Sequence, residues 1–153
     1  MDIWSPEKRS EVMSAIRGSG TKPELLLQGI VSRALPRYKL ETNPTSLPGR
    51  PDLYLPSLRL AIFVEGCFWH CCPKHGSIPQ SNVEYWIPKL KANVSRDRKV
   101  ERLLRRQGLS VWHIWEHDLR SAKLEDTENR LARRLKSRSN QLKTATRRSS
   151  SHL

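Results

Sequence analysis

Residues 49–75 gather most of the chemically reactive side chains of this chain into one short segment. The segment opens with Gly-Arg-Pro-Asp52, continues through an apolar run and reaches a second acid at Glu65. All three cysteines of the chain follow within positions 67–72, together with two aromatic residues and a histidine. A hydrophobic core alone does not require this combination. The pattern therefore predicts two short strands that present an active site at one edge of a sheet.

Apolar runs bounded by turn residues predict the strands of that sheet. Residues 52–55 and 58–64 are expected to form two of them, and the second is apolar throughout, as is typical of a buried central strand. A further run at residues 109–115 predicts another buried strand, and residues 38–42 predict a short first strand.

Two helices are predicted from their end signals. Thr21-Lys-Pro-Glu24 has the order of an N-cap, a first-turn proline and a capping-box acid, so a helix is expected up to about Leu35. A long basic helix should begin near Ser81-Asn-Val-Glu84 and run to Gln107, with Gly108 as its C-terminal stop. Pro88 fits this helix only in or near its first turn.

The two ends of the chain differ from the middle. Residues 5–17 predict a short helix carrying Met13, and Gly18-Ser-Gly20 separates it from the rest. A last amphipathic helix is expected at residues 124–135, followed by a Ser-, Lys- and Arg-rich segment with no acid after Glu128. We therefore expect an N-terminal helix in residues 1–20, a catalytic domain in residues 21–136 and a disordered basic tail in residues 137–153.

Length and charge bound the class of protein. A chain of 153 residues can form one domain with its own core and needs no disulfide bonds. Its 28 Lys and Arg residues exceed its 15 Asp and Glu residues, and the formal net charge of +13 indicates a polyanionic partner, most commonly nucleic acid. No signal region or membrane-spanning run is evident, so we expect a cytoplasmic protein that contacts no membrane. Three crowded cysteines in that compartment indicate a metal site rather than disulfides.

The two acids of the reactive segment are placed to bind a hard cation. Because side chains alternate along strands, an acid that opens one strand and an acid that closes its neighbour can converge at one edge of a sheet. Asp52, the Val64 carbonyl oxygen and Glu65 would then offer the oxygen ligands of Mg²⁺, an ion that supports phosphodiester cleavage. The alternative is structural: Asp52 caps a loop and Glu65 pairs with an arginine.

The cysteines indicate a second metal site. Cys67, Cys72 and His75 lie close in sequence, and His117 follows a predicted strand from which it can fold back. Four sulfur and nitrogen ligands are typical of structural Zn²⁺. The spacing does not distinguish Cys71 from Cys72 as a ligand. One alternative is that the thiols are buried as small apolar groups, and another is a redox role for Cys67 and Cys72, which lack the Cys-x-x-Cys spacing.

The histidines and one further acid complete the predicted catalytic set. His70 lies between the two predicted metal sites, where a histidine beside a metal-bound water is a natural general base. Glu24 is a candidate to orient His70 or the waters of a second metal ion, although its place in a capping box also explains it. His113 lies on an apolar strand and is interpreted as a core residue.

Aromatic residues on this basic scaffold indicate how DNA would be bound. Phe68 and Trp69 belong to the cysteine-containing loop, and Trp86 opens the long basic helix. Flat apolar side chains can wedge between base steps at a cost of about a few kcal/mol of unstacking. Such a cost favours DNA that is already weakened, for example by a mismatch.

Several motifs resemble those of the very-short-patch repair (Vsr) DNA mismatch endonucleases. The resemblance spans the chain from about Arg9 to Leu119 and implies a restriction-endonuclease-like α/β fold, with a mixed central sheet flanked by helices and a structural zinc loop. It also implies an enzyme that nicks one DNA strand at T:G mismatches, which arise when 5-methylcytosine is deaminated. The motifs are Leu-Pro-Gly-Arg-Pro-Asp52, Gly-Cys-Phe-Trp-His70, Glu84-Tyr-Trp86, Asn93-Val-x-Arg96-Asp97-Arg98 and Trp115-Glu116.

The resemblance also implies roles for individual residues. Asp52 would be the essential Mg²⁺ ligand, His70 would activate water and Glu24 would support it. Structural zinc would be held by Cys67, Cys72, His75 and His117. The N-terminal helix would clamp the DNA, and the DNA contacts would be Met13, Phe68, Trp69, Trp86, Asn93 and Arg96.

The chain departs from the family pattern at two places. Members of the family have a histidine, associated with the leaving group, directly before the Gly-Cys-Phe-Trp-His run, whereas this chain has Glu65. Glu65 instead resembles the second acid of the wider Pro-Asp…(Asp/Glu)-x-Lys nuclease pattern, with Cys67 at the lysine position. The metal loop differs from the family form by one residue in spacing, and two ligands are exchanged between Cys and His.

Three functions follow as hypotheses. The first is a Mg²⁺-dependent mismatch endonuclease that acts as a monomer on double-stranded DNA in the bacterial cytoplasm, at the nucleoid, with mismatch-repair proteins as further partners. The second is a restriction-type endonuclease that acts on paired or modified DNA. The third is a non-catalytic zinc module that only binds DNA.

Overall fold

A mixed four-stranded sheet forms the centre of the computed structural model, which describes residues 5, 7–8 and 20–151. The strands lie in the order β1–β2–β3–β4, with antiparallel pairing between the first three and parallel pairing between β3 and β4. The predicted α/β class and mixed sheet are confirmed. The strand bounds are β1 Glu41–Thr42, β2 Leu53–Leu55, β3 Leu60–Glu65 and β4 Ser110–Trp115.

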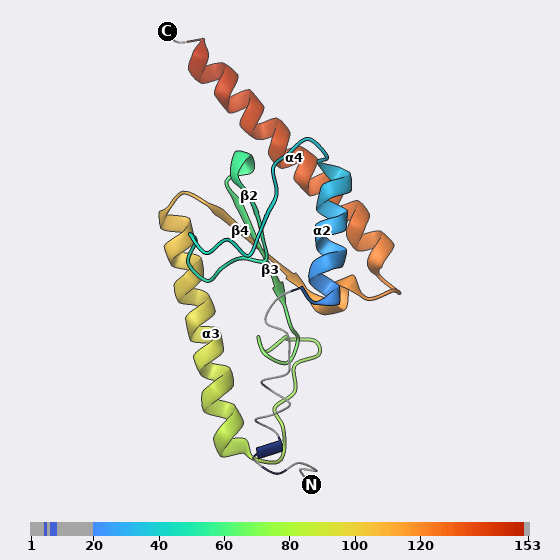
Figure 1. Cartoon of the computed structure of the whole chain (residues 1–153), viewed down its shortest axis with the longest axis vertical. Coiled ribbons are helices and arrows are strands. Elements are labelled where there is room, and N and C mark those ends of the chain that lie inside the picture. The colour runs from blue at the N-terminus through green and yellow to red at the C-terminus, as the bar shows by residue number, and fades with distance from the viewer. Residues whose placement is uncertain (1–4, 6, 9–19, 152–153) are drawn as a thin grey trace.

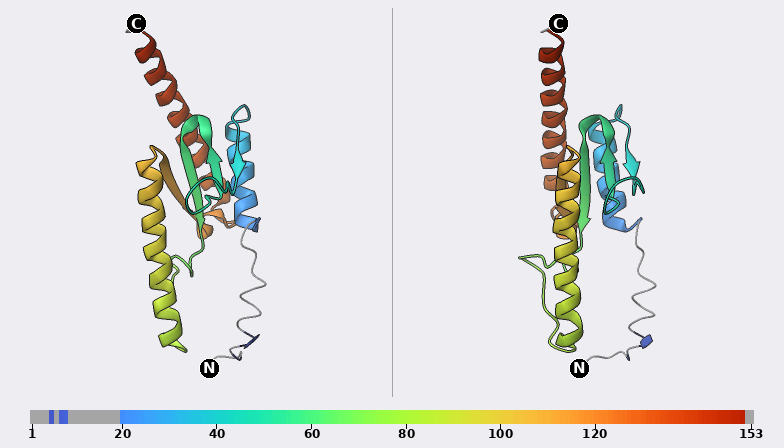
Figure 2. Two further views of the ribbon diagram at one scale, coloured as in Figure 1. Left: turned by 60° about the vertical axis from the view of Figure 1, so that its left-hand side comes forward. Right: turned by 90° about the vertical axis from the view of Figure 1, so that its left-hand side faces the viewer.

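Helices cover both faces of the sheet (Figures 1 and 2). The long helix α3 (Val83–Arg106) lies on one face and connects the parallel strands β3 and β4. Helices α2 (Lys22–Ala34) and α4 (Leu124–Ser150) lie on the other face and pack against each other. The β3–α3–β4 connection is the usual way to join two parallel neighbours, because such strands need a long crossover.

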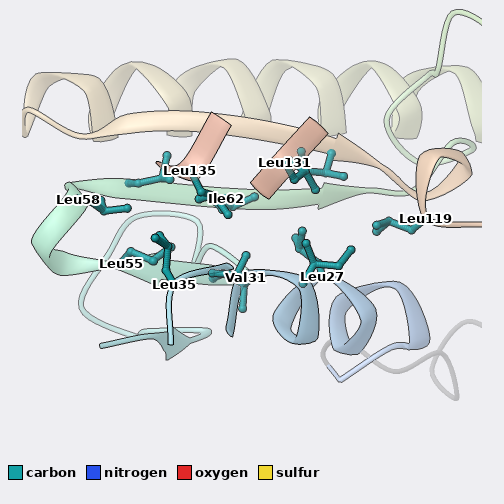
Figure 3. Packing of buried hydrophobic residues seen from close by; sticks show 13 residues of the cluster. Leu27, Val31, Leu35, Leu55, Leu58, Ile62, Leu119, Leu131 and Leu135 are labelled. Atoms are coloured by element: carbon teal, nitrogen blue, oxygen red, sulfur yellow. The ribbon is translucent and has the colours of Figure 1, made fainter. Parts of the chain in front are cut away.

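The core is split by the sheet, as side-chain alternation requires. Leu60 and Ile62 of β3 join the larger core with α2 and α4, and Figure 3 shows Leu27, Val31 and Leu135 meeting there. The intervening Ala61 belongs to a smaller core on the α3 side. By the same alternation, Phe63 and Glu65 face α3, and this placement decides where the candidate site forms.

The helix starts agree with the sequence only in part. In α2, Thr21 is the N-cap, but its hydroxyl donates to Glu24 Oε1 at 3.0 Å, and the Gly20 N–H donates to Glu24 Oε2 at 2.7 Å. Helix α3 begins at Val83. Pro88 therefore lies inside the helix and just beyond its first turn, whereas the sequence analysis expects it in or near that turn. Proline lacks the N–H that would bond to the Glu84 carbonyl, and Glu84 is exposed to water there.

Helix α4 is longer than the sequence analysis predicts. The expectation of a helix end at residue 135 and a disordered tail from residue 137 is wrong, because the helix is continuous to Ser150. Ser139, which is buried, and Leu142, which is partly buried, extend the core-facing stripe of the helix by about two turns. The Ser139 hydroxyl is hydrogen-bonded to Tyr38. Arg138 donates two hydrogen bonds to the Leu58 carbonyl at 3.0 and 3.2 Å. The last turns project beyond the sheet (Figure 1).

Gly49 allows the loop before β2 to pass close to α3. Its φ is +71°, which residues with a Cβ rarely adopt, and a Cβ there would lie 2.4 Å from Val100 Cγ1. The contact fixes the segment that leads through the buried Pro51 to Asp52. Glycine is therefore required here by both backbone conformation and space.

The predicted N-terminal helix with Met13 lies outside the described residues. Among the helices that are described, none is long and apolar enough to cross a membrane.

We expect Leu135→Ala to lower the free energy of unfolding by about 2–5 kcal/mol, because the side chain is fully buried between α4 and the sheet. Gln141→Ala, an exposed change on the same helix, should alter it by less than about 0.5 kcal/mol. Urea denaturation of the two variants measures both values. Equal midpoints would contradict the packing of α4 described above.

Candidate active site and metal centre

Asp52 lies directly before β2, at the edge of the sheet where β3 ends. Its Oδ2 accepts a 2.7 Å hydrogen bond from the Val64 backbone N–H. The N–H and C=O of one strand residue point toward the same neighbouring strand, so the Val64 carbonyl oxygen is directed to this side as well. This arrangement suits two oxygen ligands of one hard cation.

The surroundings of Asp52 favour a cation. Burial raises the pKa of Asp52 to about 6, although the hydrogen bond from Val64 acts in the opposite direction. The nearby charges of Glu24 and Glu65 raise the pKa further, whereas His70 lowers it. The chain thus brings three of its predicted catalytic acids together, and a cation among them would relieve their repulsion.

His70 is held by two carboxylates. Its Nδ1 lies 2.5 Å from Asp97 Oδ2 and 2.7 Å from Glu65 Oε2. Burial opposes a charge on the ring, but the hydrogen bonds and charges of Glu65 and Asp97 outweigh it and raise the pKa of His70 to about 9. With Nδ1 engaged as a donor, Nε2 is the nitrogen that exchanges a proton with a bound water.

Glu65 contacts a second histidine on its other oxygen. His113 Nδ1 lies 2.6 Å from Glu65 Oε1, and His113 Nε2 lies 3.1 Å from Glu101 Oε2. Burial disfavours charge on Glu65, yet the hydrogen bonds from both imidazoles outweigh it and lower the pKa of Glu65 to about 2. The interpretation of His113 as a core residue is wrong, because the residue is exposed. Its two ring nitrogens are hydrogen-bonded to acids.

Asp97 and Glu101 are site residues that the sequence analysis did not assign. Both lie on α3, four positions apart, and therefore share one face of the helix. The available signal was this pair of acids within an otherwise basic helix. Their direction toward β3 and β4 depends on how α3 is rotated, which sequence alone does not give.

The four predicted zinc ligands converge. The ligand atoms of Cys67, Cys72, His75 and His117 all lie within 4.8 Å of one another. His117 Nδ1 is 3.2 Å from the sulfur of Cys67 and 3.6 Å from that of Cys72. A tetrahedral zinc ion with ordinary bond lengths separates sulfur and nitrogen ligands by about 3.6 Å. The donor set therefore fits a structural ion.

The structure also separates the two adjacent cysteines. Cys72 is buried within the cluster, whereas Cys71 is exposed and outside it. Cys71 has a φ of +53°, so the backbone turns between them. The loop is tied to the end of β4 through Glu116, whose Oε1 accepts a 3.0 Å hydrogen bond from the Cys67 N–H.

The predicted DNA-contacting aromatics form one cluster. Phe68 packs edge-on against both Trp69 and Trp86, with ring centroids 5.0 and 5.3 Å apart. Trp86 is buried, and Phe68 and Trp69 are partly exposed. Lys89 Nζ lies 5.7 Å from the ring centroid of Trp69, so the cluster carries a positive charge at its rim.

The remaining predicted DNA contacts lie on α3 beside this cluster. Asn93 donates to the Trp69 carbonyl at 3.5 Å, and Arg96 donates to Asn93 Oδ1 at 3.3 Å. Asn93 therefore supports the aromatic loop, and Arg96 is exposed. Met13 lies outside the described residues.

Comparisons with known proteins identify a family and several relatives of this chain. A family model described as DNA mismatch endonuclease Vsr matches residues 1–75. Type II nicking enzyme V.NaeI of Lentzea aerocolonigenes is 42% identical over 113 residues, which cover 72% of this chain and 68% of the relative. Type II nicking enzyme V.XorIIP of Xanthomonas oryzae pv. oryzae is 38% identical over 121 residues, which cover 77% of this chain and 86% of the relative. DNA mismatch endonuclease Vsr of Escherichia coli is 33% identical over 123 residues, which cover 78% of this chain and 76% of the relative.

We expect Cys72→Ala to remove a bound metal ion and to lower the melting temperature, because metal binding to such a site contributes to folding. Cys71→Ala is the matched control and should retain both the ion and the stability, since Cys71 is outside the cluster. Metal analysis of the purified variants, with thermal melting before and after a chelator, measures the effect. Loss of the ion from Cys71→Ala alone would contradict the ligand set.

Proposed function

Because the chain belongs to the family of Vsr DNA mismatch endonucleases and related nicking enzymes, we propose that it nicks one strand of duplex DNA at a T:G mismatch with the help of Mg²⁺. The observation that carries the proposal is the convergence of Asp52, the Val64 backbone and His70 at one edge of the sheet. Endonuclease activity itself follows from the family. The mismatch and the metal are the proposed parts.

Asp52 and the Val64 carbonyl oxygen would hold Mg²⁺, which supplies Lewis-acid stabilisation of the phosphate and lowers the pKa of a bound water. His70 would accept the proton of the attacking water at Nε2. The His70 ring must be neutral for this step, and a cation beside Asp52 would lower the pKa of His70. Asp97 keeps the ring oriented through Nδ1, and Glu24 adds negative charge next to Asp52.

Zn²⁺ is the proposed ion of the Cys67, Cys72, His75 and His117 cluster. The cluster supplies four sulfur and nitrogen donors. These complete the tetrahedral coordination of a structural zinc site without any further ligand. The ion would fix residues 67–75 to His117 at the end of β4. His70 and the loop aromatics belong to this same segment, so zinc would position them without taking part in the reaction.

Selection of the mismatch is assigned to the aromatic cluster. Phe68 and Trp69 are partly exposed, rest on the buried Trp86 and lie beside the basic face of α3. Insertion of such rings unstacks a base step, which costs less where pairing is already weak. A T:G step is such a place. The net charge of the chain supplies attraction to the phosphates irrespective of sequence.

We expect Asp52→Ala to lower the nicking rate on a T:G duplex by about 10³-fold or more, because the proposed metal contributes several kcal/mol to the transition state. DNA binding should survive, and Glu41→Gln, a surface change on β1, should nick normally. Single-turnover nicking of end-labelled T:G and T:A versions of one duplex is the measurement.

Full activity of Asp52→Ala would refute the proposed mechanism. Equal nicking of T:G and T:A duplexes by the wild-type protein would instead favour a restriction-type enzyme on paired DNA. Absence of any Mg²⁺-dependent nicking would favour a module that only binds DNA.

We expect Trp69→Ala to weaken binding to a T:G duplex by about tenfold, since stacking of a base on an aromatic side chain contributes roughly 1–3 kcal/mol. Trp69→Phe retains a flat ring and should bind nearly as well as the wild type. Fluorescence anisotropy in the absence of Mg²⁺ compares the variants on T:G and T:A duplexes. An equal loss on both duplexes would argue against a role in mismatch selection.

A further inference from the structure

Carboxylates and imidazoles alternate in a chain that leads from the candidate active site to the surface. Each link is a contact of 2.5 to 3.1 Å between a carboxylate oxygen and an imidazole nitrogen, and Asp97 and Glu65 share the Nδ1 of His70. The outermost acid, Glu101, accepts a 2.9 Å hydrogen bond from Arg105 Nε. The chain draws on the loop after β3, on β3, on β4 and on α3. Its members, in order, are Asp97, His70, Glu65, His113 and Glu101.

Glu65 is the central link of this chain. It is a buried acid, with 5% of its surface exposed, and each of its oxygens has an imidazole nitrogen at hydrogen-bond distance. A buried carboxylate is tolerated when both oxygens are paired, and loss of either partner leaves an unsatisfied charge. The contact with His113 is therefore part of what keeps the Glu65 carboxylate in one orientation.

The distance between Glu65 and His70 is that of a direct hydrogen bond. The 2.7 Å from Glu65 Oε2 to His70 Nδ1 is typical of a charge-assisted hydrogen bond. The ligand atoms of Glu65, His70 and Asp97 also lie close enough together to hold a metal ion. In the scheme proposed below, Glu65 acts on the imidazole, while the Val64 backbone and Asp52 hold the metal, and the Mg²⁺ dependence of the variants tests this division.

His113 is itself fixed on three sides. Its ring stacks on Phe63, with centroids 5.7 Å apart and planes at 17°, and its two nitrogens face Glu65 and Glu101. These contacts leave one orientation in which Nδ1 meets Glu65. A ring held in this way can transmit its position to the acid that it contacts.

We propose that His113 is a positioning residue of the nicking reaction: by holding Glu65, it makes this acid an orienting partner of His70 rather than a metal ligand. The inference rests on the proposed function of His70. His113 touches neither the DNA nor the metal in this scheme and acts through Glu65 alone.

The test compares two substitutions of His113. Phenylalanine keeps the ring that stacks on Phe63 but removes the hydrogen bond to Glu65. Asparagine places an amide Nδ2 near the position of Nδ1, so it can still donate to Glu65 although it cannot reach Glu101. Ser110→Ala, on the same strand and outside the chain of hydrogen bonds, is the control. Thermal melting confirms that each variant is folded.

We expect His113→Phe to lower the single-turnover nicking rate at saturating DNA by about 10-fold, while the DNA dissociation constant and the Mg²⁺ half-saturation stay within about twofold of wild type. His113→Asn should regain most of the rate. In the double variant with Glu65→Ala, His113→Phe should cause no further loss, because both changes break the same link.

Three results would overturn the inference: wild-type rates for His113→Phe, a deficit that disappears at higher Mg²⁺ or DNA concentration, or additive losses in the double variant. The rates are measured on whichever duplex the wild-type protein nicks. A wild-type protein that prefers T:A over T:G DNA would therefore contradict the mismatch proposal, and the His113 comparison would still be decided on the T:A duplex.

Discussion

Parallel pairing of β3 with β4 is the constraint on which both candidate sites depend. The register places Phe63 opposite His113 and Glu65 opposite Trp115, so the two strands end together at one edge of the sheet. The loop after β3 therefore starts beside His117, and the cysteines of that loop meet it. On the α3 side of the same strands, Glu65 meets His113. One register thus forms the metal cluster and the acid–imidazole chain.

The sequence predicts those features that residues close together in the chain determine, and it misses those that depend on contacts between distant residues. Helix α2, helix α3 and the apolar strands follow from local patterns, and the convergence of Cys67, Cys72, His75 and His117 follows from ligand chemistry with very few cysteines to choose from. His113 could not be assigned, because its partner is set by strand register. The length of α4 was missed because its last buried turn uses Ser139, whose burial depends on Tyr38, a residue distant in sequence.

The candidate active site is acidic, whereas the chain as a whole is strongly basic. A protein with a formal charge of +13 concentrates Glu24, Asp52, Glu65 and Asp97 at one edge of its sheet. Basic residues elsewhere attract the phosphates of DNA, and this group of acids would repel them without a cation. Attraction and repulsion are therefore separated in space. In the proposed mechanism, a divalent ion would be needed only where the scissile phosphate lies close to the carboxylates.

The close approach of Gly49 to Val100 has a consequence for how recognition and cleavage are linked. Helix α3 carries Trp86 at its start, Asp97 near its middle and Val100 directly beneath the loop that ends at Asp52. With no room for even one added carbon between loop and helix, a tilt of α3 displaces the segment that holds Asp52. If the aromatic end of α3 contacts DNA as proposed, distortion of the duplex there would be transmitted through the helix to the segment that holds Asp52, and recognition would be coupled to cleavage.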